Sequence, residues 1–113
     1  MVATMEEYVF ACKVEALPAR GKKTIILNGK RILIVTCDQG IYAIEDKCPQ
    51  TGGRMALGKV LDCSITSPNN GARYSLETGQ YIDSGVSPLQ SHWLTVFPVK
   101  IVDGDVRVLL GNL

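Results

Sequence analysis

The chain has 113 residues, of which 46% are hydrophobic, so a single domain can bury a core without crosslinks. The formal net charge is +1 and the basic residues are spread along the chain, which argues against a nucleic-acid or membrane partner. No apolar run reaches the length of a membrane span, and the N-terminal stretch "MVATMEEYVF" has acids where a secretory signal needs bases, so a cytoplasmic protein is expected.

The first half of the chain predicts a three-stranded meander. The β-branched runs "TIILN" and "RILIVT" are joined at Asn28-Gly29, a strong signal for a two-residue hairpin whose central positions both need positive φ. A second turn follows at residues 38–40. The next run, "IYAIED", alternates apolar and polar residues as a half-buried strand does.

The middle of the chain has a different composition. From Asp46 to about Gly85 it is rich in Gly, Pro, Ser, Thr and Asn, with short strand-like pieces around "GKVLD", "CSIT" and "ARYSL". Such loops on a rigid scaffold often carry function. We therefore expect one domain, with a β base at about residues 6–45 and 86–113 and an inserted loop-rich subdomain at about residues 46–85.

The C-terminal part predicts another hairpin. The runs "WLTVFPVKIV" and "DVRVLL" flank Asp103-Gly104, and Val106, Val108 and Leu110 share one face with period two. Pro98 predicts an edge or a bulge in the first of these strands, and Trp93 is expected in the core. No window has helical periodicity, so the fold class is all-β, a small antiparallel sandwich or barrel.

The four cysteines give no metal-site spacing. Cys12, Cys37, Cys48 and Cys63 are widely separated and include no C-x-x-C pair, which argues against a zinc site or an all-cysteine cluster. A disulfide framework is also not expected in a cytosolic chain. Cys12 and Cys37 lie in apolar strand-like runs, so we interpret both as small buried hydrophobic residues.

The segment "GIYAIEDKCPQTGGRMALGKVLDCSITSPNNGARYSLETGQ" resembles the centre of a Rieske ferredoxin. In that family a first loop of the form C-P-H-x-G is followed by a second loop C-P-x-H-G-x-x-F and then by L-x-T-G. The run "FPVKIVDGDVRV" is similar to the family's closing hairpin. The closest patterns are those of small ferredoxins that serve aromatic-ring-hydroxylating oxygenases and of Rieske-like small subunits of NAD(P)H nitrite reductases. The resemblance implies a Rieske-like (ISP) fold.

The same resemblance assigns the four cluster-ligand positions to Cys48, Gln50, Ser67 and Asn70. A Rieske centre is a 2Fe-2S cluster with two thiolate and two imidazole ligands. The whole chain holds a single histidine, His92, so no alignment supplies two imidazoles. Serine and amide side chains are poor ligands for soft, sulfide-bridged iron. We predict that these residues hold no cluster, and we expect no cofactor and no metal.

The frame of the two loops is intact by comparison with the family pattern. Pro49, Gly52, Pro68, Gly71 and the turn "LETG" keep their places, so we predict that the loops still fold. Gln50, Ser67 and Asn70 each offer donors and acceptors, and we expect them to join the loops through hydrogen bonds.

The interpretation is a cluster-free Rieske-fold accessory or small-subunit protein of an oxidoreductase system. It would act by protein–protein contact with an oxygenase or reductase component, and no residue is predicted to be catalytic. The hypothetical contact surface comprises Gln50, Thr51, Arg54, Asn69, Asn70 and Arg73. Two alternatives stay open: an electron-carrying ferredoxin with unusual ligands such as Cys48 and Cys63, and an enzyme that uses Cys48 as nucleophile in the vacated polar pocket.

Overall fold

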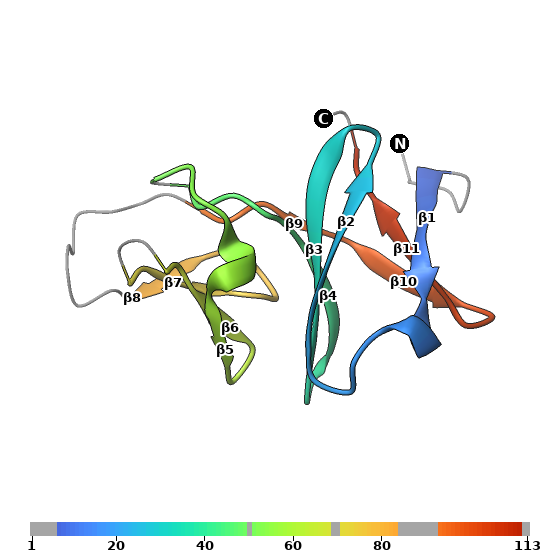
Figure 1. Ribbon diagram of the computed structural model, residues 1–113, viewed down its shortest axis with the longest axis horizontal. Coiled ribbons are helices and arrows are strands. Elements are labelled where there is room, and N and C mark those ends of the chain that lie inside the picture. The colour runs from blue at the N-terminus through green and yellow to red at the C-terminus, as the bar shows by residue number, and fades with distance from the viewer. Residues whose placement is uncertain (1–6, 50, 69–70, 84–92, 112–113) are drawn as a thin grey trace.

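The computed structural model describes residues 7–49, 51–68, 71–83 and 93–111, and in these residues three antiparallel sheets lie side by side as layers (Figure 1). The outer sheet comprises β1 (Tyr8–Lys13), β11 (Asp105–Leu109) and β10 (Val99–Val102). The central sheet comprises β2 (Gly21–Leu27), β3 (Lys30–Cys37), β4 (Gly40–Glu45) and β9 (Val96–Phe97). The loop-side sheet comprises β5 (Lys59–Leu61), β6 (Ser64–Thr66), β7 (Arg73–Ser75) and β8 (Tyr81–Asp83).

The described residues include two 3-10 segments, η2 (Val14–Ala16) and η3 (Met55–Leu57), and no α-helix. The predicted all-β class is therefore confirmed. No helical segment within these ranges is long and apolar enough to cross a membrane.

The predicted hairpins form at the expected residues. Asn28 and Gly29 have φ values of 51° and 78° between β2 and β3, and Asp103 and Gly104 have values of 51° and 80° between β10 and β11. These left-handed conformations explain why Asn-Gly and Asp-Gly are found there. Val106, Val108 and Leu110 are all buried, as their alternation predicts.

The central sheet is buried on both of its faces. From β3, Ile32 and Ile34 pack towards the outer sheet, whereas Leu33 and Val35 pack towards the loop-side sheet. This position explains the unbroken apolar run of β3, because a strand covered on both sides needs no polar face. The prediction that β4 buries only one of its faces is wrong. Its consecutive residues Ala43 and Ile44 point to opposite faces and are both fully buried, Ala43 against the outer sheet and Ile44 against the loop-side sheet.

Pro98 divides the last long run between two sheets. Val96–Phe97 pairs with β4 in the central sheet, and Val99–Val102 pairs with β11 in the outer sheet. Pro98 has no N–H to donate to a ladder, and its carbonyl accepts from the N–H of Leu109 at 3.0 Å. The expected single strand is therefore two strands. Trp93 is 57% exposed, so its predicted place in the core is wrong.

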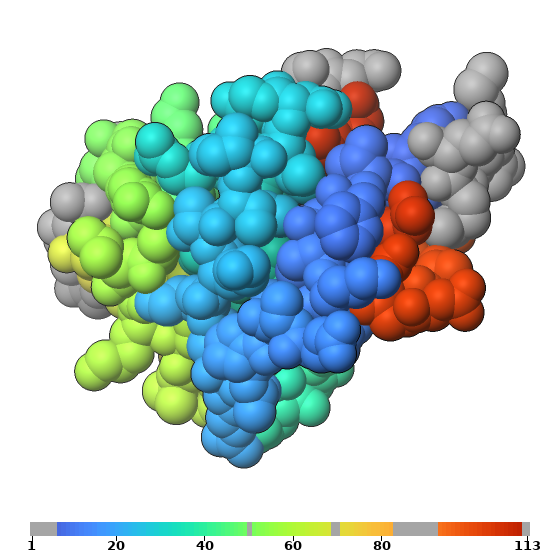
Figure 2. All heavy atoms as spheres, turned by 45° about the vertical axis from the view of Figure 1, so that its right-hand side comes forward, coloured from blue at the N-terminus to red at the C-terminus, as the bar shows by residue number. Residues whose placement is uncertain are grey.

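The loop-side sheet is held firmly against the central sheet. Tyr74 and Ile65 of this sheet share one hydrophobic core with Leu33 and Val35. Polar contacts add to this packing, because Lys22 Nζ donates to the carbonyl of Gly58. The space-filling view shows the segment after β4 in direct contact with β2 (Figure 2). The loop-side sheet runs from Lys59 to Asp83, and the subdomain bounds of about 46–85 stay a prediction.

Candidate functional site

The first loop follows β4 and closes on itself through backbone hydrogen bonds. The N–H of Cys48 donates to the carbonyl of Gly53 at 2.7 Å, and the N–H of Gly52 donates back to the carbonyl of Cys48 at 2.9 Å. Gly52 has a φ of 77°, which favours glycine. The hydroxyl of Thr51 accepts from the N–H of Gly53 at 3.1 Å. The loop therefore forms a closed turn built from its own backbone.

The second loop, after β6, repeats this arrangement. The N–H of Ser67 donates to the carbonyl of Ala72 at 2.7 Å, and the N–H of Gly71 donates to the carbonyl of Ser67 at 3.0 Å. Gly71 has a φ of 75°. Ser67 thus occupies in the second loop the backbone position that Cys48 occupies in the first.

Both of these residues are buried. Cys48 is fully buried within the core shared by the central and loop-side sheets, where Leu33, Met55 and Ala72 are also found. Ser67 is 1% exposed. A thiol enclosed by apolar side chains cannot meet a substrate from solvent, which argues against Cys48 as a nucleophile.

Three predicted site residues, Gln50, Asn69 and Asn70, lie outside the described residues, as does His92. The hydrogen-bonded network predicted among Gln50, Ser67 and Asn70 therefore stays a prediction.

Cys63 lies at the other end of β6 from Ser67. The strand Ser64–Thr66 separates the two residues, which corresponds to about 13 Å along an extended chain. Cys63 instead approaches Cys37, with 3.1 Å between the two sulfur atoms. This placement argues against Cys63 as a displaced ligand beside Cys48. It also corrects the interpretation of Cys37, which is half-buried and contacts another thiol.

Arg54 and Asp46 tie the first loop to the central sheet. The fully buried Asp46 carboxylate accepts from Arg54 Nε at 2.9 Å and from the N–H of Ala56 at 2.8 Å. Arg54 Nη2 donates to the hydroxyl of Thr24 on β2 at 3.2 Å. Sequence reasoning missed Asp46, because a polar residue at the end of a strand gives no sign of burial. Arg54 keeps a 47% exposed side chain while it holds the loop.

The remaining residues of the hypothetical contact surface lie in or beside the two loops. Thr51 is exposed within the first loop, and Arg73 is a half-buried residue at the start of β7, just after the second loop.

The donor chemistry of the four assigned positions does not fit a Rieske centre. The sequence supplies one thiol there, on Cys48, and the other three positions carry a hydroxyl and two amides. Two thiolates and two imidazoles are needed for such a centre. Within the described ranges, no group of three or more His, Cys, Asp or Glu side chains is placed to hold a metal ion.

Comparison with known families gives a match that covers most of the chain. The Rieske-like [2Fe-2S] domain matches residues 7–109. A search of curated proteins finds no significant match.

Solved structures with the same fold include complexes and isolated subunits. The reduced complex between oxygenase and ferredoxin in carbazole 1,9a-dioxygenase has a TM-score of 0.84 at 21% identity, covering 94% of this chain and 29% of that one. The terminal oxygenase of carbazole 1,9a-dioxygenase from Nocardioides aromaticivorans IC177 also has a TM-score of 0.84, at 20% identity, with 94% and 30% covered. At these identities the likeness shows the fold alone, and this chain spans less than a third of the matched chains.

A putative nitrite reductase NADPH small subunit oxidoreductase protein is similar over its whole length. It has a TM-score of 0.74 at 27% identity, and the match covers 90% of this chain and 97% of that one.

Proposed function

The chain belongs to the Rieske-like [2Fe-2S] domain family, and we propose that it is a cluster-free member that works by protein–protein contact. Its role would be that of an accessory or small-subunit protein of an oxidoreductase system. The observation that carries this proposal is Ser67, which is buried and occupies the backbone position that Cys48 occupies in the first loop. A serine hydroxyl stays protonated near neutral pH and is a poor ligand for soft iron.

The backbone of each loop closes on itself through hydrogen bonds. Two backbone hydrogen bonds, between 2.7 and 3.0 Å long, hold each loop in its turn. Asp46 and Arg54 anchor the first loop to the central sheet, and Cys48 is part of the hydrophobic core. These contacts stabilise each loop through its own backbone and the hydrophobic core, so the proposal requires no cofactor for folding.

The relatives favour an oxidoreductase partner. The putative nitrite reductase small subunit has about the same length as this chain, and the carbazole 1,9a-dioxygenase structure is a complex of oxygenase with ferredoxin. We propose that this protein binds the reductase or oxygenase component of a comparable system in the cytoplasm. Neither nucleic acid nor a membrane is proposed as a partner.

The proposed contact surface is the loop end of the molecule, furthest from the outer sheet in Figure 1. Thr51 and Arg73 are its described members, together with Arg54, and Gln50, Asn69 and Asn70 complete it. Arg54 is exposed although two of its nitrogen atoms donate to Asp46 and Thr24, whereas Arg73 is half-buried.

The test is photo-crosslinking in the native cells, with a photoreactive residue at Thr51 and, as control, at Lys100. Lys100 is also exposed but lies on β10 of the outer sheet. The proposal expects Thr51 to crosslink to a subunit of a reductase or an oxygenase, identified by mass spectrometry, and Lys100 not to do so. The same products from both positions, or none from Thr51, would contradict the proposed surface.

A further inference from the structure

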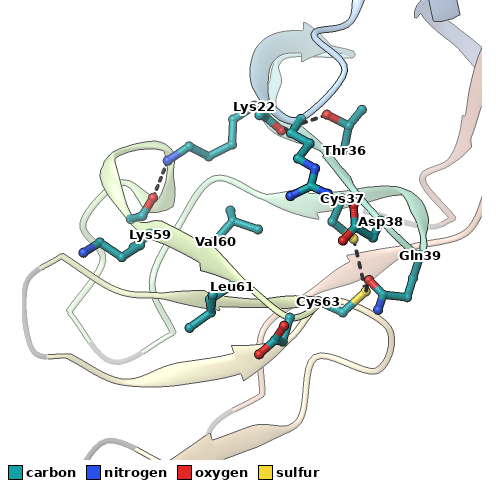
Figure 3. Close-up of a pocket in the computed structure, with 13 residues that line it drawn as sticks. Lys22, Thr36, Cys37, Asp38, Gln39, Lys59, Val60, Leu61 and Cys63 are labelled. Atoms are coloured by element: carbon teal, nitrogen blue, oxygen red, sulfur yellow. Dashed lines mark hydrogen bonds and ion pairs between the residues drawn. The ribbon is translucent and has the colours of Figure 1, made fainter.

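We propose that Cys37 and Cys63 form a redox-active dithiol site, which reacts with an anionic low-molecular-weight disulfide of the glutathione type. The product is a reversible disulfide between the central and loop-side sheets. The two sulfur atoms are 3.1 Å apart and face each other at one wall of a pocket (Figure 3). Because neither residue belongs to the loops of Cys48 and Ser67, this proposal does not rest on the proposed function.

Cys63 occupies a turn position that normally takes glycine. Asp62 and Cys63 join β5 to β6 with φ values of 49° and 59°. In the hairpins at residues 28–29 and 103–104, which have the same left-handed pair, the second residue is a glycine. A side chain with a Cβ is unfavourable in this conformation. Strain of this kind is often found at functional sites, and here the strained residue is the one that presents the thiol.

Both thiols are held on anchored backbone. Cys37 ends β3 in the central sheet, and the carbonyl of Cys63 accepts from the N–H of Leu76 at 2.9 Å. The Cys63 thiol donates to Oε1 of Gln39 at 3.0 Å. A disulfide bond is about 2.05 Å long, so the sulfur atoms need to approach by only about 1 Å.

The pocket gives a small molecule access to the pair. It has a volume of about 380 Å³, and Cys37 and Cys63 line it together with the basic residues Arg20, Lys22 and Lys59. Two acids, Asp38 and Asp62, also line it, and Arg20 pairs with Asp38 at 2.5 Å. Three cations against two anions favour a ligand with negative charge. Glutathione disulfide has free carboxylates and meets this requirement, with one of its two glutathione units in the pocket.

The reaction is two successive thiol–disulfide exchanges. The Cys37 thiolate attacks a sulfur of the small disulfide, because burial raises the pKa of the Cys63 thiol and disfavours its thiolate. A bond forms between Cys37 and one glutathione, and the other glutathione leaves as a thiolate. The Cys63 thiolate then attacks the Cys37 sulfur of this mixed disulfide and expels the second glutathione. The protein sulfurs lose two electrons and the small disulfide gains them, while the two protons from the protein thiols pass to the released glutathiones.

The experiment equilibrates the reduced full-length protein with glutathione disulfide, alkylates the remaining thiols under denaturing conditions and maps them by mass spectrometry. We expect one crosslinked peptide pair, Cys37 with Cys63, and alkylation of Cys12 and Cys48. Cys12→Ser is the matched control and is expected to keep the crosslink. Alkylation of both Cys37 and Cys63 after equilibration with excess disulfide, or crosslinks that involve Cys48, would overturn the proposal.

Two further variants separate chemistry from folding. Cys63→Gly suits the left-handed turn, so we expect it to raise the urea midpoint of the reduced protein and to leave Cys37 as an unresolved mixed disulfide with glutathione.

Lys59→Gln is expected to slow the reaction with glutathione disulfide roughly threefold and to leave the rate of reaction with neutral hydroxyethyl disulfide unchanged. A lower midpoint for Cys63→Gly would refute the strained turn, and equal rates for Lys59→Gln would refute the anionic ligand.

Discussion

At the scale of single residues, Asp46 is the side chain in the loops whose removal should lower the stability of the fold most. Its buried carboxylate accepts two charge-assisted hydrogen bonds, from Arg54 and from the backbone of Ala56. Bonds of this type contribute more than neutral ones, so Asp46→Ala is expected to lower the free energy of unfolding by about 3 kcal/mol. Urea denaturation followed by circular dichroism measures this change.

Asp38 provides the matched control for that variant. It also pairs with an arginine, Arg20, but its side chain is 62% exposed. Exposed ion pairs contribute little, so Asp38→Ala should cost less than about 1 kcal/mol. Equal losses for the two variants would mean that burial of the Asp46 carboxylate does not matter for stability.

Titration of the thiols and of one tyrosine predicts a loss of stability at high pH. Burial raises the pKa of the Cys12 and Cys63 thiols above the ordinary value of 9.0. The hydrogen bond with Cys63 raises the pKa of the Tyr42 phenol. Each folded-state pKa lies above that of the unfolded chain, so the folded protein binds these protons more tightly. This contribution is complete below about pH 9 and is lost as the pH rises through the raised pKa values.

The measurement is the urea midpoint at a series of pH values from neutral to alkaline, under anaerobic conditions with a reductant. We expect the midpoint to fall above pH 9, and to fall less in Tyr42→Phe, which has no phenol to ionise. A midpoint that is flat across this range, or an unchanged fall in Tyr42→Phe, would show that these groups are not linked to folding.

Single residues also show how far sequence reasoning reached. Cys48 and Ser67 were assigned by resemblance to equivalent places in two loops, and the backbone hydrogen bonds of those loops are equivalent in the structure. The contact of Cys37 with Cys63 could not be predicted, because they lie 26 positions apart in the sequence and only the packing of two sheets brings them together. No local pattern carries that information.

At the scale of elements, Gly79 lies in the turn between β7 and β8 of the loop-side sheet. This turn contacts Leu94, which precedes β9 of the central sheet. Gly79 has a φ of 82°, and its carbonyl accepts from the N–H of Leu94 at 2.8 Å. A Cβ added there would lie 2.0 Å from the carbonyl oxygen of Leu94. Gly79→Ala is therefore expected to cost about 4 kcal/mol, from backbone strain and a steric clash together.

The variant Gly29→Ala distinguishes backbone strain from the steric clash. Its φ of 78° is almost the same, but no atom lies within 4 Å of an added Cβ. Gly29→Ala should therefore cost only the strain, about 1 kcal/mol. Chemical denaturation of both variants gives the comparison, and similar losses would show that the contact with Leu94 is unimportant.

The elements that the sequence predicted best are those whose turns have their own chemical signal. Asn28-Gly29 and Asp103-Gly104 carry such a signal, and both hairpins are found. The turn at Asp62-Cys63 lacks glycine and was not recognised, although it has the same φ pattern. Pro98 was expected to mark an edge or a bulge in one strand, but the chain passes there from one sheet to another, which depends on tertiary packing.

At the scale of the whole molecule, the layered arrangement separates two possible sites. The loops of Cys48 and Ser67 lie at one end of the loop-side sheet, and the Cys37–Cys63 pair lies at the other end of β6, between the loop-side and central sheets. The first site carries the proposed contact with an oxidoreductase partner, and the second carries the proposed thiol chemistry. A Cys37–Cys63 disulfide would close a segment that contains the whole first loop but not the second, so oxidation would restrain only the first-loop part of the proposed contact surface.

The measurement that tests the central claim most directly is the absorption spectrum of anaerobically purified protein, with iron and acid-labile sulfide assayed on the same sample. The positive control is the variant Gln50→His, Ser67→Cys and Asn70→His, which restores the ligand set of the family. We predict a colourless, iron-free and folded native protein, and iron, sulfide and a visible charge-transfer band in the restored variant. Stoichiometric iron and sulfide in the native protein would contradict the account, because the chain would then be an electron carrier with other ligands.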